Sequence, residues 1–378
     1  MDWLVNLIYY VVPFVVLLGI LVFVHELGHY LVAKFSGVQV EAFSIGFGKE
    51  LWGFVDKSGT RWKISAIPLG GYCQFLGDGD ETSTTSEAKA LTEEQKKKAF
   101  AYQSPFKKLL ISLAGPAANY VFAVLIFASI FYFIGKIEFP PVVGEVVKGG
   151  AAEQAGILPK DRILSVNGKK VDSFTDVRRE VELNTEEKVR VELERGGKVI
   201  KLAFPLQYIE IENDAALDKT ETRRPMLGIR SVNVVEVQKL DLNVFQALRD
   251  AGIEVWNITD MTLRGVGQMI VGERGSEEIG GVIRIAEMSG DITRQQGILN
   301  LLVFMALLSV NLGLINLFPI PLLDGGHVVI YLIEIATRRE INEKVKDGLF
   351  KVGFALLISL MVFATWNDVV RLFNRWFA

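Results

Sequence analysis

The residues best suited to chemistry are two histidines and a glutamate within five positions. His25, Glu26 and His29 form the pattern His-Glu-x-x-His. Because positions i and i+4 share one face of an α-helix, both imidazoles can bind one metal ion. The intervening Glu26 is then placed to take a proton from a water held by that ion. The spacing therefore predicts a hydrolytic metal centre with His25 and His29 as ligands and Glu26 as general base.

Two histidines leave a catalytic zinc one protein ligand short, since such sites normally have three and keep a position open. Asp324 is the first charged residue after the uncharged stretch 295–323. Prolines before it break a helix, and the glycines after it permit backbone conformations that can aim a side chain inward. Asp324 is a candidate third ligand, although an ordinary helix end capped by an aspartate has the same pattern.

Four stretches of the chain are apolar and free of charge. About 20 apolar residues are needed to cross the bilayer core, so these stretches predict four transmembrane helices. His25 directly follows the first stretch, where the alternative is that the polar residues simply mark the end of the span. Ionisable residues at membrane depth are costly and usually functional, which favours the metal site. The stretches are Trp3–Val24, Leu109–Gly135, Gln295–Leu323 and Val352–Asn367, the last continuing through Asp368 to Val370.

The first stretch could also be a signal peptide, but its flanks disfavour this. Asp2 precedes it, no Lys or Arg does, and no small-x-small cleavage site follows it. Basic residues gather in the connections 34–108 and 338–351. The positive-inside rule therefore predicts that both connections are cytoplasmic, and that the N-terminus, residues 137–294 and the C-terminus lie outside.

Two regions outside the spans have recognisable patterns. Residues 40–80 contain the turn signals Phe47-Gly48 and Ser58-Gly59, and Arg61–Ile67 alternates polar with apolar residues. With the glycines and apolar content of the region, this predicts a hairpin packed against or dipping into the membrane face. A loop and a surface helix are expected at 78–100. Residues 243–272 predict an amphipathic helix that lies on the outer membrane surface.

Residues 140–206 predict a compact α+β module with a tight turn at Asn167-Gly168. Its expected strands are Val142–Val147, Asp161–Val166, Lys188–Glu194 and Lys198–Phe204, and its expected helices are Ala151–Ala155 and Phe174–Leu183.

Composition narrows the classes of partner and site. The chain has 378 residues, half of them hydrophobic, and a net charge of −3, which gives no reason to expect nucleic acid as a partner. The single cysteine, Cys73, can form no internal disulfide and offers no thiolate metal site. All three histidines, His25, His29 and His327, fall inside the motifs discussed here.

Several motifs together resemble the site-2 protease family of intramembrane zinc metalloproteases, specifically its bacterial RseP-like branch. They cover three of the four spans and the loop between the first two. The motifs are HExxH at Val24–His29, NxxPxPxLDGG at Asn316–Gly326, SIGFG at Ser44–Gly48 with IPLGGY at Ile67–Tyr72, and GPxxN at Gly115–Asn119.

The resemblance implies a function and a set of site residues. It implies Zn²⁺ bound by His25, His29 and Asp324, with Glu26 as general base. Substrates would be single-span membrane proteins, such as anti-sigma factors or remnant signal peptides, cut within their transmembrane segments in regulated intramembrane proteolysis. A structural role is expected for His327. The resemblance implies substrate-binding roles for the edge of the hairpin and the Pro-rich stretch, with the residues Asn316, Pro319, Pro321, Gly70 and Gly71.

The module at 140–206 resembles a bacterial PDZ domain, which implies a peptide C-terminus as a partner. The similarity lies in Gly144-Glu145-Val146, Ala151–Ile157 and Asp161–Gly168. Relatives often carry two such modules, whereas residues 207–240 are too short for a second. Gly280–Ile283 also departs from the pattern, since relatives often have a proline after the glycines.

The expected fold is an α-helical integral membrane protein with four transmembrane helices, a membrane-associated β-hairpin and an extracytoplasmic α+β PDZ-like domain. The expected location is the bacterial cytoplasmic (inner) membrane, with the active site toward the cytoplasm. The expected divisions are 1–34 (first span with HExxH), 35–107 (hairpin and loop), 108–136 (second span), 137–240 (PDZ-like domain and linker), 241–294 (amphipathic segment) and 295–378 (third and fourth spans).

Two other classes of protein are less consistent with these residues. A non-catalytic membrane protein could recruit partners through the module and keep a structural remnant of the zinc site. The intact set His25, Glu26, His29 and Asp324 argues against it. A channel or transporter would need ionisable residues at several mid-span positions, and the four spans contain almost none.

Overall fold

The computed structural model describes residues 2–77, 91–184, 186–211, 222–231, 238–272 and 280–377. The expected loop at 78–90 lies outside this part of the chain. The described residues divide into two compact units, one within 1–126 and 280–368 and the other within 127–279 and 369–378.

Four long apolar helices dominate the chain. Each is long and apolar enough to cross a membrane, which confirms the four predicted spans. The fourth helix is longer than its charge-free stretch because it begins in the charged segment before it, at Glu343. The helices are α1 (Asp2–Phe35), α3 (Pro105–Phe133), α8 (Gly297–Asn316) and α10 (Glu343–Phe377).

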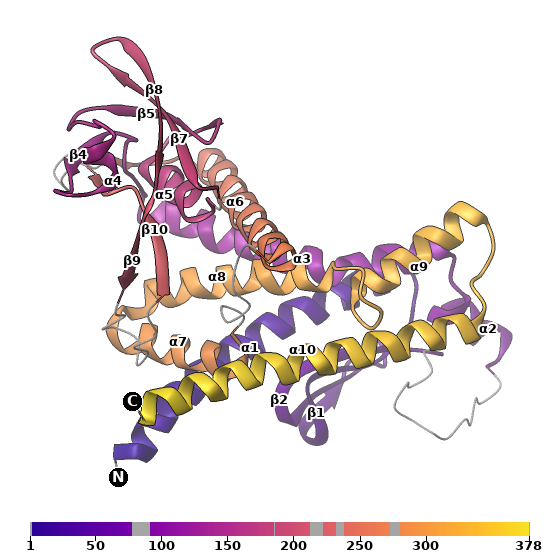
Figure 1. The fold of residues 1–378 in the computed structure, drawn as a ribbon. Helices are drawn as coiled ribbons and strands as arrows, with labels where there is room; N and C mark the ends of the chain where they lie inside the picture. Colours follow the sequence, from indigo (N-terminus) through magenta and orange to yellow (C-terminus); the bar gives the residue numbers. More distant parts are fainter. Residues whose placement is uncertain are drawn as a thin grey trace. The chain divides into compact units, whose positions relative to one another are not determined.

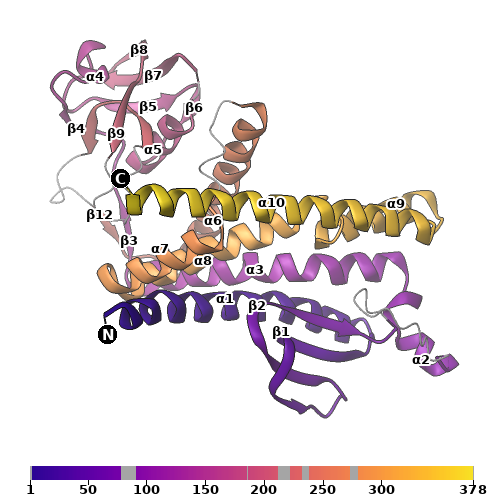
Figure 2. The ribbon, with the colours of Figure 1, turned by 60° about the horizontal axis from the view of Figure 1, so that its bottom comes forward.

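Glycines let three of these helices pack closely in the first unit (Figure 2). A Cβ atom on Gly28 of α1 would lie 2.3 Å from the carbonyl oxygen of Ala114 in α3. A Cβ atom on Gly313 of α8 would lie 3.0 Å from the carbonyl oxygen of Pro116, also in α3. Small residues at such crossings bring helix backbones together in membranes. The close packing holds α1 and α8 against the same part of α3.

Two shorter helices complete this bundle. Helix α7 (Val282–Gln295) packs against α1 and α8 (Figure 1). Its first turn is capped by the buried Asp368 of α10, whose carboxylate accepts hydrogen bonds from the backbone N–H groups of Gly281 and Arg284. Helix α9 (Asp324–Thr337) follows α8 after a short loop.

The predicted hairpin is present, and it packs against α1. Strands β1 (Val40–Val55) and β2 (Arg61–Phe75) pair antiparallel, and the turn at Ser58-Gly59 is confirmed. The expected turn at Phe47-Gly48 is wrong: these residues lie inside β1. Gly46 and Gly48 have φ of +89° and +82°, so the strand bends and shifts register without ending.

Because of the bend, one part of β1 pairs with two parts of β2. Residues 42–45 pair with 61–64 on one side and with 71–74 on the other. Among the described residues, segment 71–74 pairs with β1 alone, so it forms an edge of the sheet. The expected surface helix is α2 (Glu93–Lys98), which begins with a Thr92 capping box and is followed by a 3₁₀ turn at Phe100–Tyr102.

In the second unit, each predicted element of 140–206 is present within two residues of its expected bounds. The four-stranded sheet has the order β6-β5-β7-β8, and the turn at Asn167-Gly168 has positive φ at both residues. Its core includes the fully buried Ile163, Val189 and Leu193. The elements are β4 (Val143–Val146), α4 (Ala151–Gln154), β5 (Arg162–Val166), β6 (Lys169–Lys170), α5 (Phe174–Glu182), β7 (Lys188–Arg195) and β8 (Lys198–Pro205).

Further strands and one long helix extend this unit. The expected amphipathic helix is α6 (Val244–Val271), capped by Asn243, with Ala247, Ala251 and Val255 on its buried face. Its Gln268 side chain donates to the Leu183 carbonyl after α5. The additional strands form three pairs, β3 (Lys136–Glu138) with β12 (Gln238–Leu240), β9 (Gln207–Ile211) with β10 (Thr222–Met226), and β11 (Ile229–Ser231) with β4.

Candidate functional site

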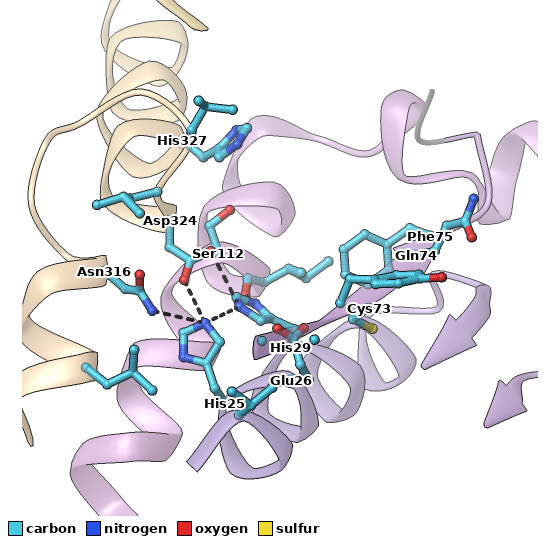
Figure 3. Close-up of a pocket in the computed structure, with 18 of the residues that line it drawn as sticks. His25, Glu26, His29, Cys73, Gln74, Phe75, Ser112, Asn316, Asp324 and His327 are labelled. Atoms are coloured by element: carbon cyan, nitrogen blue, oxygen red, sulfur yellow. Dashed lines mark hydrogen bonds and ion pairs between the residues drawn. The ribbon is translucent and has the colours of Figure 1, made fainter. Parts of the chain in front are cut away.

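The structure brings His25, His29 and Asp324 together at one point. The two histidines lie one turn apart on α1, with their Nε2 atoms 3.2 Å apart. The Asp324 carboxylate lies 3.1 Å from His25 Nε2 and 3.4 Å from His29 Nε2 (Figure 3). About three hundred residues of chain separate the histidines from Asp324, so this meeting is a property of the fold.

The loop between α8 and α9 aims Asp324 at the histidines. Leu322 has a φ of +86°, a left-handed conformation that reverses the chain after Pro321. A Cβ atom on Gly325 would lie 2.3 Å from the carbonyl oxygens of Leu317 and Phe318. Glycine is therefore required at position 325 to let α9 begin so close to the end of α8.

The three donor groups fit a zinc ion. A tetrahedral zinc with bonds of about 2.0–2.1 Å separates its ligand atoms by about 3.3 Å. The measured separations among the two Nε2 atoms and the carboxylate oxygens are 3.1–3.4 Å. Two imidazoles and one carboxylate are also a ligand set known from catalytic zinc sites, with one position left open.

Residues of helix α3 contact the Nδ1 atoms of both histidine rings. His29 Nδ1 lies 2.7 Å from the Ile111 carbonyl oxygen and donates to it, which leaves the lone pair on Nε2 free to bind a metal. His25 Nδ1 lies 3.1 Å from the Asn119 side-chain amide. Gly115 lies between these two contacts, and a Cβ atom there would be 2.2 Å from His29 Nε2.

Glu26 faces the same space as the histidines. Its carboxylate accepts a hydrogen bond from the Cys73 backbone N–H of β2. In Figure 3, Glu26 lies beside His29 and Cys73. The edge segment 71–74 of β2 therefore holds the candidate base, Glu26, next to the candidate metal position.

A cavity of about 850 Å³ surrounds this group. Its wall includes Gly70 and Gly71 of β2 and Asn316 at the end of α8, whose amide nitrogen lies 3.5 Å from His25 Nε2. Pro319 and Pro321 do not line it. They lie in the loop before Asp324, where the Pro321 carbonyl packs against Gly353 of α10.

The charge on Asp324 suits a metal ligand. Burial alone would raise the pKa of its carboxyl, but the His25 and His29 rings beside it outweigh burial and hold the pKa well below its ordinary value. The group is therefore ionised at neutral pH, as metal binding requires. His327 lies farther along α9, its ring 5.2 Å from that of Phe350, and burial lowers its pKa. Within the described part of the chain, the group able to hold a metal is His25, His29 and Asp324.

Sequence reasoning assigned no role to Gly115 or Asn119, although both stand in the GPxxN motif. A signal was present, because Asn119 is a strongly polar residue within a charge-free stretch. The structure buries it completely, beside His25.

Comparisons with known proteins bear on what this site does. The model of peptidase family M50 matches residues 13–360. Two proteins named putative zinc metalloproteases are similar over nearly their whole length. R01501 of Rhizobium meliloti is 40% identical over 374 residues, covering 98% of both chains, and Atu1380 of Agrobacterium fabrum is 38% identical over 369 residues, covering 96% of both.

A third relative, Metalloprotease MmpA of Caulobacter vibrioides, is 33% identical over 377 residues, covering 94% of both chains. The family match includes α1 with both histidines and the start of α9 with Asp324. Four membrane-length helices accompany it. The chain therefore belongs to peptidase family M50, the site-2 protease family, and is a zinc metalloprotease of the membrane.

Proposed function

We propose that this chain is an intramembrane zinc endopeptidase that hydrolyses peptide bonds within transmembrane segments of single-span membrane proteins. The observation that carries the proposal is that His25 and His29, inside a membrane-length helix, lie at ligand spacing from each other and from Asp324. Membrane-bound anti-sigma factors and remnant signal peptides are the expected substrates, in regulated intramembrane proteolysis.

In this proposal His25, His29 and Asp324 hold the zinc, and Glu26 is the general base. When bound, the ion polarises the scissile carbonyl and lowers the pKa of the attacking water. The Glu26 carboxylate accepts a proton from that water and delivers it to the leaving amine nitrogen. The hydrogen bond from the Cys73 N–H keeps this carboxylate oriented toward the cavity.

The substrate backbone must be unwound before it can be cut, because a helix hides its amides in its own hydrogen bonds. Segment 71–74 supplies a strand edge that can pair with the freed backbone of the substrate. Gly70 and Gly71 line the cavity beside this segment and would contact the paired substrate, and the Asn316 amide is placed to hold the substrate backbone or the oxyanion. Pro319 and Pro321 contribute by shaping the loop that carries Asp324.

The proposed location is the bacterial inner membrane, with the cavity open to the cytoplasm and the lipid bilayer around the four spans. The basic residues of 34–108 and 338–351 support this orientation. The PDZ-like domain within 137–240 would lie outside and bind a peptide C-terminus. Its order of strands and helices agrees with the sequence expectation.

The test is cleavage of a short single-span substrate by the full chain purified in detergent. Wild type, Glu26→Gln, a chelator-treated sample and the control Glu41→Gln, an exposed glutamate at the start of β1, are compared by mass spectrometry. We expect a cut inside the apolar segment by wild type and Glu41→Gln only. Zinc content should be unchanged in Glu26→Gln, because Glu26 is not a ligand. Turnover by Glu26→Gln would remove its assigned role, and zinc-loaded wild type that cuts no transmembrane segment would favour the non-catalytic alternative.

A further inference from the structure

Asn119 of α3 is a buried polar side chain whose hydrogen bonds are incomplete. The residue is 0% exposed, and its Nδ2 lies 3.1 Å from His25 Nδ1. Its Oδ1 is also buried and has no hydrogen-bond partner among the described residues. A buried amide with one unpaired end is costly, so we look for the role of Asn119 in the side chain that it does contact, His25.

His25 needs an acceptor at this position. Its Nε2 faces His29 and Asp324, and that nitrogen must present a lone pair to bind a metal. A neutral imidazole with a free Nε2 carries its proton on Nδ1, which then donates a hydrogen bond. His29 meets the same requirement through the Ile111 carbonyl. The Asn119 amide is the group that lies at His25 Nδ1.

The two ends of a side-chain amide have nearly the same shape, so a half-turn of the group exchanges oxygen and nitrogen without moving anything else. With the oxygen toward His25, Asn119 accepts a hydrogen bond from Nδ1–H, and the amide nitrogen takes the position that has no partner among the described residues. We propose that Asn119 is the positioning residue of His25, its side-chain oxygen accepting a hydrogen bond from Nδ1–H and so fixing the ring for zinc binding through Nε2. This inference rests on the proposed metal centre.

The backbone of Asn119 is held in place for this role. Its carbonyl oxygen accepts a hydrogen bond of 2.9 Å from the buried Ser309 hydroxyl of α8. Gly313, one turn further along α8, lies close to the carbonyl of Pro116, which is in α3 like Asn119. Because α3 is fixed against α8 here, the amide cannot move away from His25 by a shift of the helix.

The test measures zinc affinity of the full chain in detergent by competition with a fluorescent chelator. Asn119→Leu keeps the approximate volume and removes the acceptor, and we expect it to weaken zinc binding about 10–100-fold, as loss of a ligand's hydrogen-bond partner does elsewhere. Asn119→Asp keeps an acceptor, so its affinity and its Co²⁺ absorption spectrum should match those of wild type. The control Ser289→Ala removes a buried hydrogen bond within α7, from the Ser289 hydroxyl to the Ala286 carbonyl, and should leave zinc affinity unchanged.

The outcomes separate this inference from the proposed function. Wild-type affinity in Asn119→Leu, or equal loss in Asn119→Leu and Asn119→Asp, would overturn the acceptor role while leaving the metal centre in place. If Asn119→Leu does not fold, a tenfold or greater loss in folded Asn119→Asp overturns the role by itself. Wild type that binds no zinc would overturn the metal centre, and this inference with it.

Discussion

Gly115 lies directly behind the two histidine rings, at the place where α3 passes the metal centre. A Cβ atom at this position would be 2.2 Å from His29 Nε2 and 2.8 Å from His25 Cε1. The rings cannot turn aside without losing their contacts to Ile111 and Asn119. We expect Gly115→Ala to weaken zinc binding at least tenfold and to reduce proteolysis in proportion, because misplaced ligands lose affinity on this scale. Chelator competition and substrate cleavage measure the two effects.

The matched control is Gly19→Ala in α1, where an added Cβ would meet no atom within 4 Å. Alanine is the better helix former by about 0.5–1 kcal/mol, so this variant should be at least as stable as wild type and fully active. Normal zinc affinity in Gly115→Ala would show that the histidine rings have more freedom than these distances allow.

Site residues could be predicted from the sequence where the chemistry requires a fixed spacing between them. His25, Glu26 and His29 could be assigned from the helical repeat alone, because all three lie on one element. Asp324 needed the family resemblance, since its approach depends on the backbone of Leu322 and on Gly325. Asn119 and Gly115 could be assigned only from the structure, because their roles depend on how α3 packs against α1.

Among the elements, α1 and α3 lie close together at Gly28, which stands between the two histidines in the sequence. A Cβ atom here would lie 2.3 Å from the Ala114 carbonyl oxygen and 2.7 Å from Ala118 Cβ. Backbone cannot move aside as a side chain can, so Gly28→Ala should separate the helices. We expect a loss of about 1–3 kcal/mol in stability, as for an overpacked core, together with loss of activity. Thermal unfolding in detergent checks it, with Gly19→Ala of the same helix as control. Unchanged stability in Gly28→Ala would mean that the crossing is looser than described.

In the second unit, Asp161, directly before β5, is paired with Arg195 of β7, and we expect this pair to respond to pH. The buried Asp161 carboxylate accepts hydrogen bonds from Arg195 at 2.7 and 2.8 Å and from the Leu158 N–H at 2.8 Å. Burial raises the pKa of Asp161, but these bonds outweigh it and lower the pKa below its ordinary value of 3.8. A lowered pKa means that the stabilisation is complete above about pH 4 and is lost as the pH falls further.

Hydrogen exchange of the full chain, corrected for the intrinsic effect of pH, tests this pair. Protection of residues 162–166 should fall below about pH 4 in wild type. In Asp161→Asn it should be about tenfold lower at neutral pH and change little with pH, because the charge-assisted bonds are gone. Equal protection in the two proteins at neutral pH would contradict the assignment.

The elements were predictable where local pattern and packing agree. Strands and helices of 140–206 appear as expected because alternation, turn residues and caps all favour the same structure there, as at Ser173 before α5. Phe47-Gly48 misled because glycine permits a left-handed residue inside a strand as well as in a turn. Only pairing with β2, which is not local, decides between them.

For the whole molecule, the proposed orientation places the catalytic cavity and the PDZ-like domain on opposite sides of the membrane. The chain offers a direct test, because its single cysteine lies in the cavity wall. Cys73 is half-buried there, next to Glu26. A cavity of about 850 Å³ that is open to water has room for a small water-soluble reagent.

A membrane-impermeant maleimide should therefore label Cys73 in inside-out membrane vesicles but not in right-side-out ones. The matched protein is Lys198→Cys in a Cys73→Ser background, where position 198 is exposed at the start of β8. It should show the opposite pattern, and both should react after solubilisation in detergent. If both cysteines react from one side, the cavity and the module share a face and the charge-based topology is wrong. If each reacts from the side opposite to that expected, the separation holds but the cavity draws its water from outside the cell, and substrates must be sought among proteins unwound at that face.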